Sequence, residues 1–279
     1  MAQAVLRRGA PNVIPGFAPS LALSLCAVGC IVLLPIAAVV LTMSGITGAQ
    51  LWHLAASSRA IDSYRVTFGS ALIAAGIDTV VGLAIAWVLV RYRFPGRRVL
   101  DLAIDIPFAL PTAVAGIALA TLYNDRGWLG APLAAHGIHV AFTQLGIVVA
   151  MVFVGLPFAV RTVASVLSEL PHELDEAAET LGSRQPNTFL RVTLPLLAPA
   201  MLVGFSMALA RGIGEYGSII FIAGNLPHRT EITAILIITR LEEYDYQGAT
   251  ALAAVMLAAS FVLILIINLL QRRVRWPGL

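Results

Sequence analysis

Residues 141–210 contain two long apolar runs separated by a polar segment. They read AFTQLGIVVAMVFVGLPFAVRTVASVL (141–167), SELPHELDEAAETLGSRQPNTFLR (168–191) and VTLPLLAPAMLVGFSMALA (192–210). The first apolar run has a single charged residue, Arg161, and the second has none. Because about 20 mostly apolar residues are enough to cross a bilayer as a helix, the two runs predict membrane-spanning helices joined by a polar loop.

Four more runs of this kind lie outside that stretch, at 21–43, 66–90, 102–123 and 246–271. Of the 279 residues, 59% are hydrophobic and 12% are charged, whereas about 25% are charged in an ordinary soluble domain. The sequence therefore predicts an all-α polytopic membrane protein with six transmembrane helices, forming one domain over residues 1–279. The shorter apolar runs 216–227 and 232–239 cannot cross a bilayer, so we expect them to be re-entrant or surface-lying.

The arginines predict the orientation of the spans, because cytoplasmic loops carry an excess of basic residues. With the N-terminus in the cytoplasm, five arginines fall outside, two fall within or beside spans, and eleven fall inside: Arg7, Arg8, Arg91, Arg93, Arg97, Arg98, Arg184, Arg191, Arg272, Arg273 and Arg275. Both termini are therefore predicted to be cytoplasmic.

Several kinds of chemistry are disfavoured by the composition. All 18 residues counted as Lys or Arg are arginine, so the chain has neither the lysine of a phosphate-binding P-loop nor one for Schiff-base chemistry. Cys26 and Cys30 are one helical turn apart in an apolar run, which favours packing over a disulfide. His136 and His139 lack neighbouring acids or cysteines, so we expect no metal site.

The loop at 168–191 has the pattern of a helix. Its apolar residues recur at i, i+3, i+4 and i+7 and form one stripe: Leu174, Ala177, Ala178 and Leu181. Pro171 is typical of a first helical turn, Gly182 of a left-handed residue that ends a helix, and Ser183 of the cap of a second short helix through Phe189. The loop therefore predicts a helix–Gly–helix hairpin. Its stripe could bind a partner protein, or it could cover the helix ends of its own chain.

The same loop carries a family resemblance. Glu176-Ala177-Ala178, Gly182 four residues after Ala178, and then Val192 and Leu194-Pro195 resemble the EAA loop of permease subunits of bacterial ATP-binding-cassette importers; Val192 stands where the pattern has isoleucine. The resemblance implies a type I importer permease whose loop is a coupling helix between helices 4 and 5. It also implies that a separate ATPase subunit binds this loop through Leu174, Glu176, Ala177, Ala178, Leu181 and Gly182.

The resemblance extends over most of the chain. The segments PFALPTAVAG (107–116), RTV (161–163), RGIGEYG (211–217), FIAGN (221–225) and TEIT (230–233) are similar to T-type permeases of sulfate/thiosulfate importers. Permeases for molybdate and tungstate share parts of the first and third segments, so the sulfate assignment depends on residues 221–233. Transport of molybdate or tungstate stays an alternative.

The resemblance implies what the complete transporter contains. This chain would translocate sulfate and thiosulfate across the bacterial inner membrane by alternating access, with a second permease of the W type, two ATP-binding subunits and an external sulfate-binding protein. The chain itself would bind no cofactor, because ATP and Mg²⁺ would lie on the ATPase subunits, and we expect no nucleic-acid partner.

Two other classes of membrane protein are alternatives to an importer permease. An intramembrane hydrolase of the HExxH type fails, because His172-Glu173 is followed by Glu176 where the second histidine is required. A stand-alone secondary transporter fits six spans with intramembrane charges. ATPase activity and co-purification with a nucleotide-binding subunit would distinguish the importer from it.

Charged residues within the predicted spans are candidates for the translocation path. Arg211 and Glu215 are four residues apart and would meet on one helix face, either as a structural ion pair or with Arg211 attracting the anion. Arg161 either extends to the cytoplasmic face or lies on the path.

Two acids and two prolines also lie within the predicted spans. Asp78 and Asp105 require an arginine or backbone partner. Pro107 and Pro111 predict a kink in the third span.

Overall fold

The computed structural model describes residues 17–171 and 173–273, and every regular element in these ranges is a helix. Two short π-helical turns, η1 (Gly29–Leu33) and η2 (Phe189–Thr193), join α-helices to each other. The α-helices are α1 (Phe17–Val28), α2 (Leu34–Met43), α3 (Gly48–Ala55), α4 (Ser58–Arg91), α5 (Arg97–Ala109), α6 (Thr112–Tyr123), α7 (Gly130–Ala135), α8 (Gln144–Glu169), α9 (Glu173–Thr180), α10 (Gln185–Thr188), α11 (Leu194–Ile213), α12 (Ile219–Ile222), α13 (Thr233–Glu242) and α14 (Tyr246–Arg273). The all-α prediction is confirmed. His172 and the arginines at 7, 8 and 275 lie outside the described residues.

Five of the six predicted spans form helices of sufficient length and apolarity. They are Phe17–Met43, Ser58–Arg91, Gln144–Glu169, Gln185–Ile213 and Tyr246–Gln271. Among the described residues the bent pair α5 and α6 supplies a sixth span when the two helices are taken together. The sixth predicted crossing therefore depends on counting this bent pair as one span.

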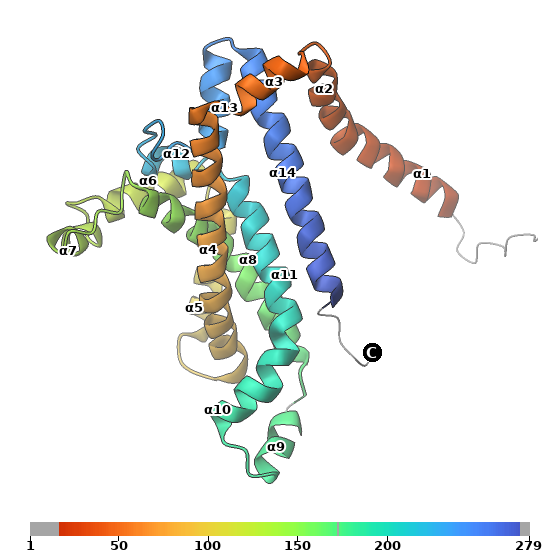
Figure 1. The fold of residues 1–279 in the computed structure, drawn as a ribbon. Coiled ribbons are helices and arrows are strands. Elements are labelled where there is room, and N and C mark those ends of the chain that lie inside the picture. Colours follow the sequence, from red (N-terminus) through yellow and green to blue (C-terminus); the bar gives the residue numbers. More distant parts are fainter. Residues whose placement is uncertain (1–16, 172, 274–279) are drawn as a thin grey trace, which may run out of the picture.

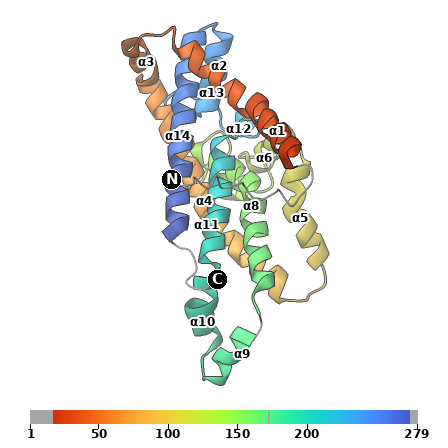
Figure 2. The same ribbon diagram turned by 90° about the vertical axis from the view of Figure 1, so that its right-hand side faces the viewer.

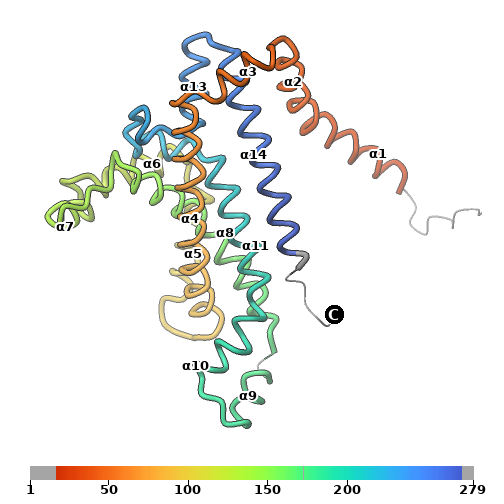
Figure 3. The backbone as a smooth tube through the Cα atoms, viewed as in Figure 1, coloured from red at the N-terminus to blue at the C-terminus, as the bar shows by residue number. Residues whose placement is uncertain are grey.

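The third predicted span is two helices instead of one. The chain bends by 116° between α5 and α6, and Figure 3 shows α6 extending to the side of α4. The bend lies at Leu110 and Pro111, which both have extended backbones with ψ of 135° and 132°. Proline disfavours a helical conformation in the residue before it, so the expected kink is present. Beyond the bend, α6 packs closely on the residue before α12, because a Cβ on Gly116 would collide with the backbone of Ser218.

The centre of the molecule is the contact of α4, α8 and α11, which lie side by side in both ribbon views (Figures 1 and 2). Small residues bring their backbones close together. A Cβ on Gly82 would lie 2.9 Å from the Cβ of Ala159, and a Cβ on Gly204 would lie 3.1 Å from the Cα of the same alanine. Close approach at small residues is a common way in which helices associate within membranes.

The two short apolar runs pack against this centre. The first contains α12, whose Ile219 and Ile222 are fully buried and which contacts α6 and α8. The second forms most of α13, which packs on α14 and α4. Neither run crosses the molecule as a long helix, so the prediction that they are too short to span is confirmed.

The first span differs from the others because α1, η1 and α2 contain no buried residue. Figure 1 shows α1 extending away from α4, α8 and α11. Its side chains are apolar on every face, so lipid or another protein must cover them.

Candidate functional site

The predicted hairpin lies at one end of the molecule. α9 and α10 extend beyond the ends of α4, α8 and α11, at the bottom of both ribbon views (Figures 1 and 2). The hairpin follows α8, which ends at Glu169, and leads through η2 into α11. It is therefore an extension of two spans.

Gly182 has the left-handed backbone that the sequence predicts, with φ of 80°. The backbone N–H of Gly182 donates to the carbonyl of Glu179 at 2.9 Å, and that of Ser183 donates to the carbonyl of Ala178 at 3.0 Å. These two bonds form a Schellman motif, which satisfies carbonyls at the end of α9. The direction in which α10 leaves α9 thus depends on this glycine.

The prediction that Ser183 caps the second helix is wrong. Arg184 occupies the N-cap of α10 and makes no side-chain capping bond. Ser183 is engaged elsewhere, because its N–H closes α9 and its hydroxyl accepts a hydrogen bond from the Thr188 hydroxyl at 3.0 Å. The second helix is also shorter than expected, since π-helical turn η2 begins at Phe189.

The apolar stripe of α9 is open to solvent. Leu181 is 88% exposed and Leu174 is 39% exposed. Ala177 and the neighbouring Glu176 are also exposed, and Ala178 is half-buried. The described part of the chain therefore leaves most of the stripe uncovered, as a surface that binds another protein would require.

Polar and aromatic contacts attach the hairpin to the end of α4. Arg91 lies 3.3 Å from the carboxylate of Asp175, which also accepts a hydrogen bond from the Thr193 hydroxyl at 3.4 Å. The rings of Trp87 and Phe189 meet edge to face with centroids 5.0 Å apart, and the Arg91 guanidinium lies 5.5 Å from the Trp87 ring. The sequence analysis missed this attachment, because the partners are far apart in the chain and no local pattern links them.

Arg211 and Glu215 form the predicted ion pair, with Nη1 and Oε2 2.7 Å apart. Glu215 lies just after α11, which ends at Ile213, so the pair is not contained in one helix as expected. The other carboxylate oxygen accepts hydrogen bonds from the backbone N–H and the hydroxyl of Ser218, at 2.8 and 2.9 Å. Glu215 is 1% exposed and Arg211 is 33% exposed. The carboxylate therefore links α11 to the residue that precedes α12.

Arg161, which the sequence places either at the cytoplasmic face or on the path, is bonded to α5. It donates to both carboxylate oxygens of Asp105, at 3.0 and 2.6 Å, and to the carboxylate and the carbonyl of Asp101, at 2.6 and 2.9 Å. Both aspartates lie on α5, whereas Arg161 lies on α8. The prediction of an arginine partner for Asp105 is confirmed, and this pairing explains why Arg161 stays beside α5.

Asp78 has no such partner, which contradicts the expectation. It is fully buried, and within residues 17–171 and 173–273 neither of its carboxylate oxygens has a hydrogen-bond partner. A Cβ on Gly155 would collide with this carboxyl group, and it would lie 3.3 Å from the Cβ of Ala208. The residues that allow α4, α8 and α11 to approach closely here offer no side-chain donor.

A network that we call the α4–α13 clamp lies at the end of the molecule opposite the hairpin (Figures 1 and 2). It comprises Arg59, Ser63, Thr67, Glu231 and Thr233. Arg59 forms a forked pair with the buried Glu231 at 2.8 and 2.7 Å. The Thr233 N–H donates to the Thr67 hydroxyl oxygen at 2.9 Å, and the Thr233 hydroxyl lies 3.3 Å from that of Ser63. Glu231 and Thr233 of the TEIT segment are therefore bonded to side chains of α4.

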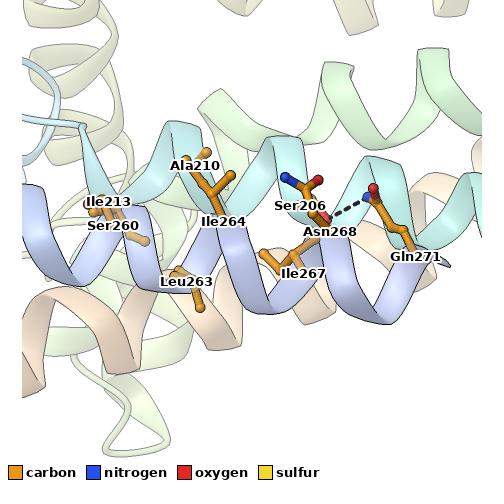
Figure 4. A pocket seen from close by; sticks show the side chains of 9 residues that line it. All are labelled: Ser206, Ala210, Ile213, Ser260, Leu263, Ile264, Ile267, Asn268 and Gln271. Carbon is orange, nitrogen blue, oxygen red and sulfur yellow. Dashed lines mark hydrogen bonds between the residues drawn. The ribbon is translucent and has the colours of Figure 1, made fainter. Parts of the chain in front are cut away.

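A cavity of about 180 Å³ lies between α11 and α14 (Figure 4). Its polar lining includes Ser206 and Gln271, which are joined by a hydrogen bond of 3.4 Å, and Asn268. None of the nine lining residues is charged. Because a dianion needs positive charge or many hydrogen-bond donors, this cavity is not a site for an oxyanion.

Comparison with known proteins gives the family. Residues 78–276 match the family model described as "Binding-protein-dependent transport system inner membrane component". The sulfate transport system permease protein CysT of Escherichia coli (strain K12) is 48% identical over 262 residues, which is 94% of this chain and 95% of the relative. The probable sulfate transport system permease protein of Nephroselmis olivacea is 51% identical over 239 residues, which is 86% of this chain and 84% of the relative.

Solved structures show the same fold at low identity. A chain of a bacterial ABC transporter that imports the acidic polysaccharide alginate matches with a TM-score of 0.76 and 14% identity, covering 93% of this chain and 96% of the other. A chain of the MetNI methionine ABC transporter matches with a TM-score of 0.59 and 16% identity, covering 83% and 100%. From its sequence match and its fold, this chain belongs to the family of binding-protein-dependent transport system inner membrane components.

Proposed function

We propose that this chain is the permease subunit through which an ATP-driven importer carries sulfate and thiosulfate across the inner membrane by alternating access. The observation that carries the proposal is the 48% identity to a sulfate transport permease over 94% of the chain. Such relatives favour sulfate over the molybdate and tungstate alternatives. Residues 1–279 form one transmembrane domain in this proposal, with both termini in the cytoplasm.

The exposed stripe of α9 supports a separate ATPase as the partner of the hairpin. Leu174 and Leu181 each gain roughly 1.5–3 kcal/mol when they are fully buried, and the two alanines gain less, so a groove on a partner would stabilise the contact. In this proposal two ATPase subunits bind ATP and Mg²⁺. A W-type permease completes the membrane part, and an external binding protein delivers the anion.

A sulfate dianion cannot cross hydrocarbon, so it requires a water-lined route between helices. Of the candidate path residues, Glu215 is buried and bonded within the chain, and Arg161 is neutralised by two acids. Arg211 is the one of the three that is partly exposed and paired with a single acid. It is therefore the candidate for positive potential along the route.

Uptake of labelled sulfate tests the proposed substrate. A strain that lacks this chain should lose uptake and regain it when the gene is returned, and excess thiosulfate should compete whereas molybdate should not. Competition by molybdate as strong as that by thiosulfate would contradict the assignment to sulfate.

Proteoliposomes test the energy source. The complex with its ATPase subunits should accumulate sulfate only when ATP is present, and ionophores that collapse ion gradients should leave uptake unchanged. Uptake that needs no ATPase subunit and stops on addition of ionophores would favour a secondary transporter.

A further inference from the structure

α5 is bounded at both ends by residues with non-helical backbones. Gly96 precedes it with φ of 89°, and Leu110 and Pro111 follow it with extended backbones. Within α5 a single described residue, Ile104, is buried, whereas α4 and α8 each bury eleven or more. Elements with few buried contacts open at low cost in free energy, and hinges are usually found at the ends of elements. α5 therefore has the features of a movable helix.

Polar contacts add to the apolar attachment of α5 to α8, in which Ile104 is buried in a cluster with Val160 and Val163. Arg161 reaches across with the four hydrogen bonds described above, two to each aspartate. One aromatic contact adds to them, since the rings of Phe108 and Phe158 meet edge to face at 5.0 Å. An arginine that forks between two carboxylates fixes the position of a helix with few apolar contacts.

The charged cluster is half-exposed although it lies within the spanning helices. The exposed fractions of the side chains are 38% for Arg161, 49% for Asp101 and 43% for Asp105. Charges in contact with hydrocarbon are very unfavourable, so the exposed side of the cluster must meet water or protein. Two acids and one arginine leave a net negative charge, which repels a sulfate dianion. The cluster is thus unsuited to bind the anion.

We propose that Arg161, Asp101 and Asp105 form a latch that holds α5 against α8 in one state of the transport cycle and opens in another, with α5 turning about Gly96 and Leu110. The proposal rests on the proposed function, because a transporter with alternating states provides the second position of α5. Arg161 is then a positioning residue. Since these three side chains are only about half-buried, separating them costs less than breaking the buried contacts between α4 and α8.

Spin labels measure the proposed movement in the assembled complex. In a background with Cys26→Ser and Cys30→Ser, one pair of labels is placed on α5 and α8 at the exposed residues Leu102 and Ser165. The control pair joins α4 and α8 at Val88 and Ser165. The distance distribution of the first pair should differ between the nucleotide-free complex and the complex with ATP bound and hydrolysis blocked, and that of the control pair should not. An unchanged first pair in both states overturns the latch.

Asp101→Asn tests the contribution of the latch itself. Arg161 keeps its forked pair with Asp105, so folding is preserved and one contact is weakened. In the nucleotide-free complex, the ratio of separated to latched distances between the labels should rise roughly threefold. No change in this ratio contradicts the latch. Because nucleotide drives the two states, this result is independent of whether labelled sulfate is taken up, which tests the proposed function separately.

Discussion

The two ends of the molecule differ in which side chains they expose and which they bury. The hairpin of α9 and α10 exposes a stripe of apolar side chains, with Leu181 almost entirely in solvent. The α4–α13 clamp buries Ser63, Thr67, Glu231 and Thr233 and pairs them within the chain. A buried polar group whose partner lies in the same chain has its hydrogen bonds satisfied. An exposed apolar stripe is stabilised when another protein covers it. Substitutions in the clamp should therefore affect folding, and those in the hairpin should affect coupling.

The largest effect is expected at the clamp. Arg59→Gln leaves the carboxylate of Glu231, which is 4% exposed, buried without its cation, and removing one partner of a buried ion pair lowers the free energy of unfolding by about 3–5 kcal/mol. The thermal midpoint of the detergent-solubilised complex measures this loss. Because the double variant Arg59→Gln/Glu231→Gln leaves no charge without a partner, it should be more stable than Arg59→Gln.

Asp62 provides a matched control on the same helix. It lies 2.8 Å from His228 and 3.5 Å from Arg65, and both of these partners are well exposed. Exposed ion pairs contribute about 0–1 kcal/mol, so Asp62→Asn should leave the thermal midpoint nearly unchanged. Equal losses for Asp62→Asn and Arg59→Gln would show that burial does not distinguish the clamp.

A slightly smaller effect is expected for Arg211 and Glu215. Arg211→Gln leaves a buried carboxylate with only its bonds to Ser218, which should lower the free energy of unfolding by about 2–3 kcal/mol. The double variant Arg211→Gln/Glu215→Gln should regain stability, because a glutamine carbonyl still accepts from Ser218. Initial rates of sulfate uptake, normalised to the amount of folded complex, should recover with it.

The same variants separate the two roles of Arg211. If the arginine attracts the anion, Glu215→Gln keeps or raises uptake, and the double variant stays as slow as Arg211→Gln despite intact assembly. We expect recovery, because the Glu215 contacts to Ser218 indicate that the pair positions α12. Failure of the double variant to recover would contradict the structural role.

Gly182→Val should damage coupling more than folding. The left-handed backbone strains a β-branched residue by about 1–3 kcal/mol, and α10 would be redirected. A Cβ there meets no atom within 4 Å, so no clash adds to the strain. Co-purification of the ATPase subunit and ATP hydrolysis stimulated by sulfate should both fall.

Gly137→Val is the matched control for this strain. Gly137 also has a positive φ, 76°, and open space around its Cα, but it follows α7, far from the hairpin in sequence. It should lose similar stability and keep its ATPase subunit. If Gly182→Val retains normal ATP hydrolysis stimulated by sulfate, the hairpin does not couple the two subunits.

The sequence predicted those features of the fold that depend on local pattern. The uncharged run 246–271 became α14, and the glycine after the stripe adopted the left-handed backbone. The sequence also contained the cause of the bend at Pro111 but neither its angle nor the contact of Gly116 with Ser218, which lies about 100 residues later in the chain.

The partners of charged side chains could not be predicted for the same reason. Helical spacing links Arg211 to Glu215 because they are four residues apart. Nothing local links Arg161 to Asp101 and Asp105, or Arg91 to Asp175, since these pairs form only when separate helices meet. Asp78, which is buried and has no hydrogen-bond partner among the residues that the structure describes, was equally beyond local pattern, because its surroundings are set by the close approach of α8 and α11.

The smallest effect is expected where the hairpin meets α4. Asp175→Asn removes the charge that Arg91 contacts at 3.3 Å but keeps an oxygen that can accept from Thr193. Asp175 is 32% exposed, and Arg91, which is 10% exposed, keeps its contact with the Trp87 ring, so the free energy of unfolding should fall by about 1 kcal/mol and the thermal midpoint only slightly. The ratio of sulfate transported to ATP hydrolysed should nevertheless fall, because the weakened contact with Arg91 would transmit less of the movement of the hairpin to α4.

Glu179→Gln is the control, since this acid lies one turn further along α9 and has no ion pair within the part of the chain that the structure describes. If both variants lower the ratio equally, charge on α9 matters only for contact with the ATPase. If Asp175→Asn alone lowers it, the contact with Arg91 carries movement of the hairpin into the spans. That outcome would give the hairpin one internal attachment comparable in role, though not in strength, to the α4–α13 clamp.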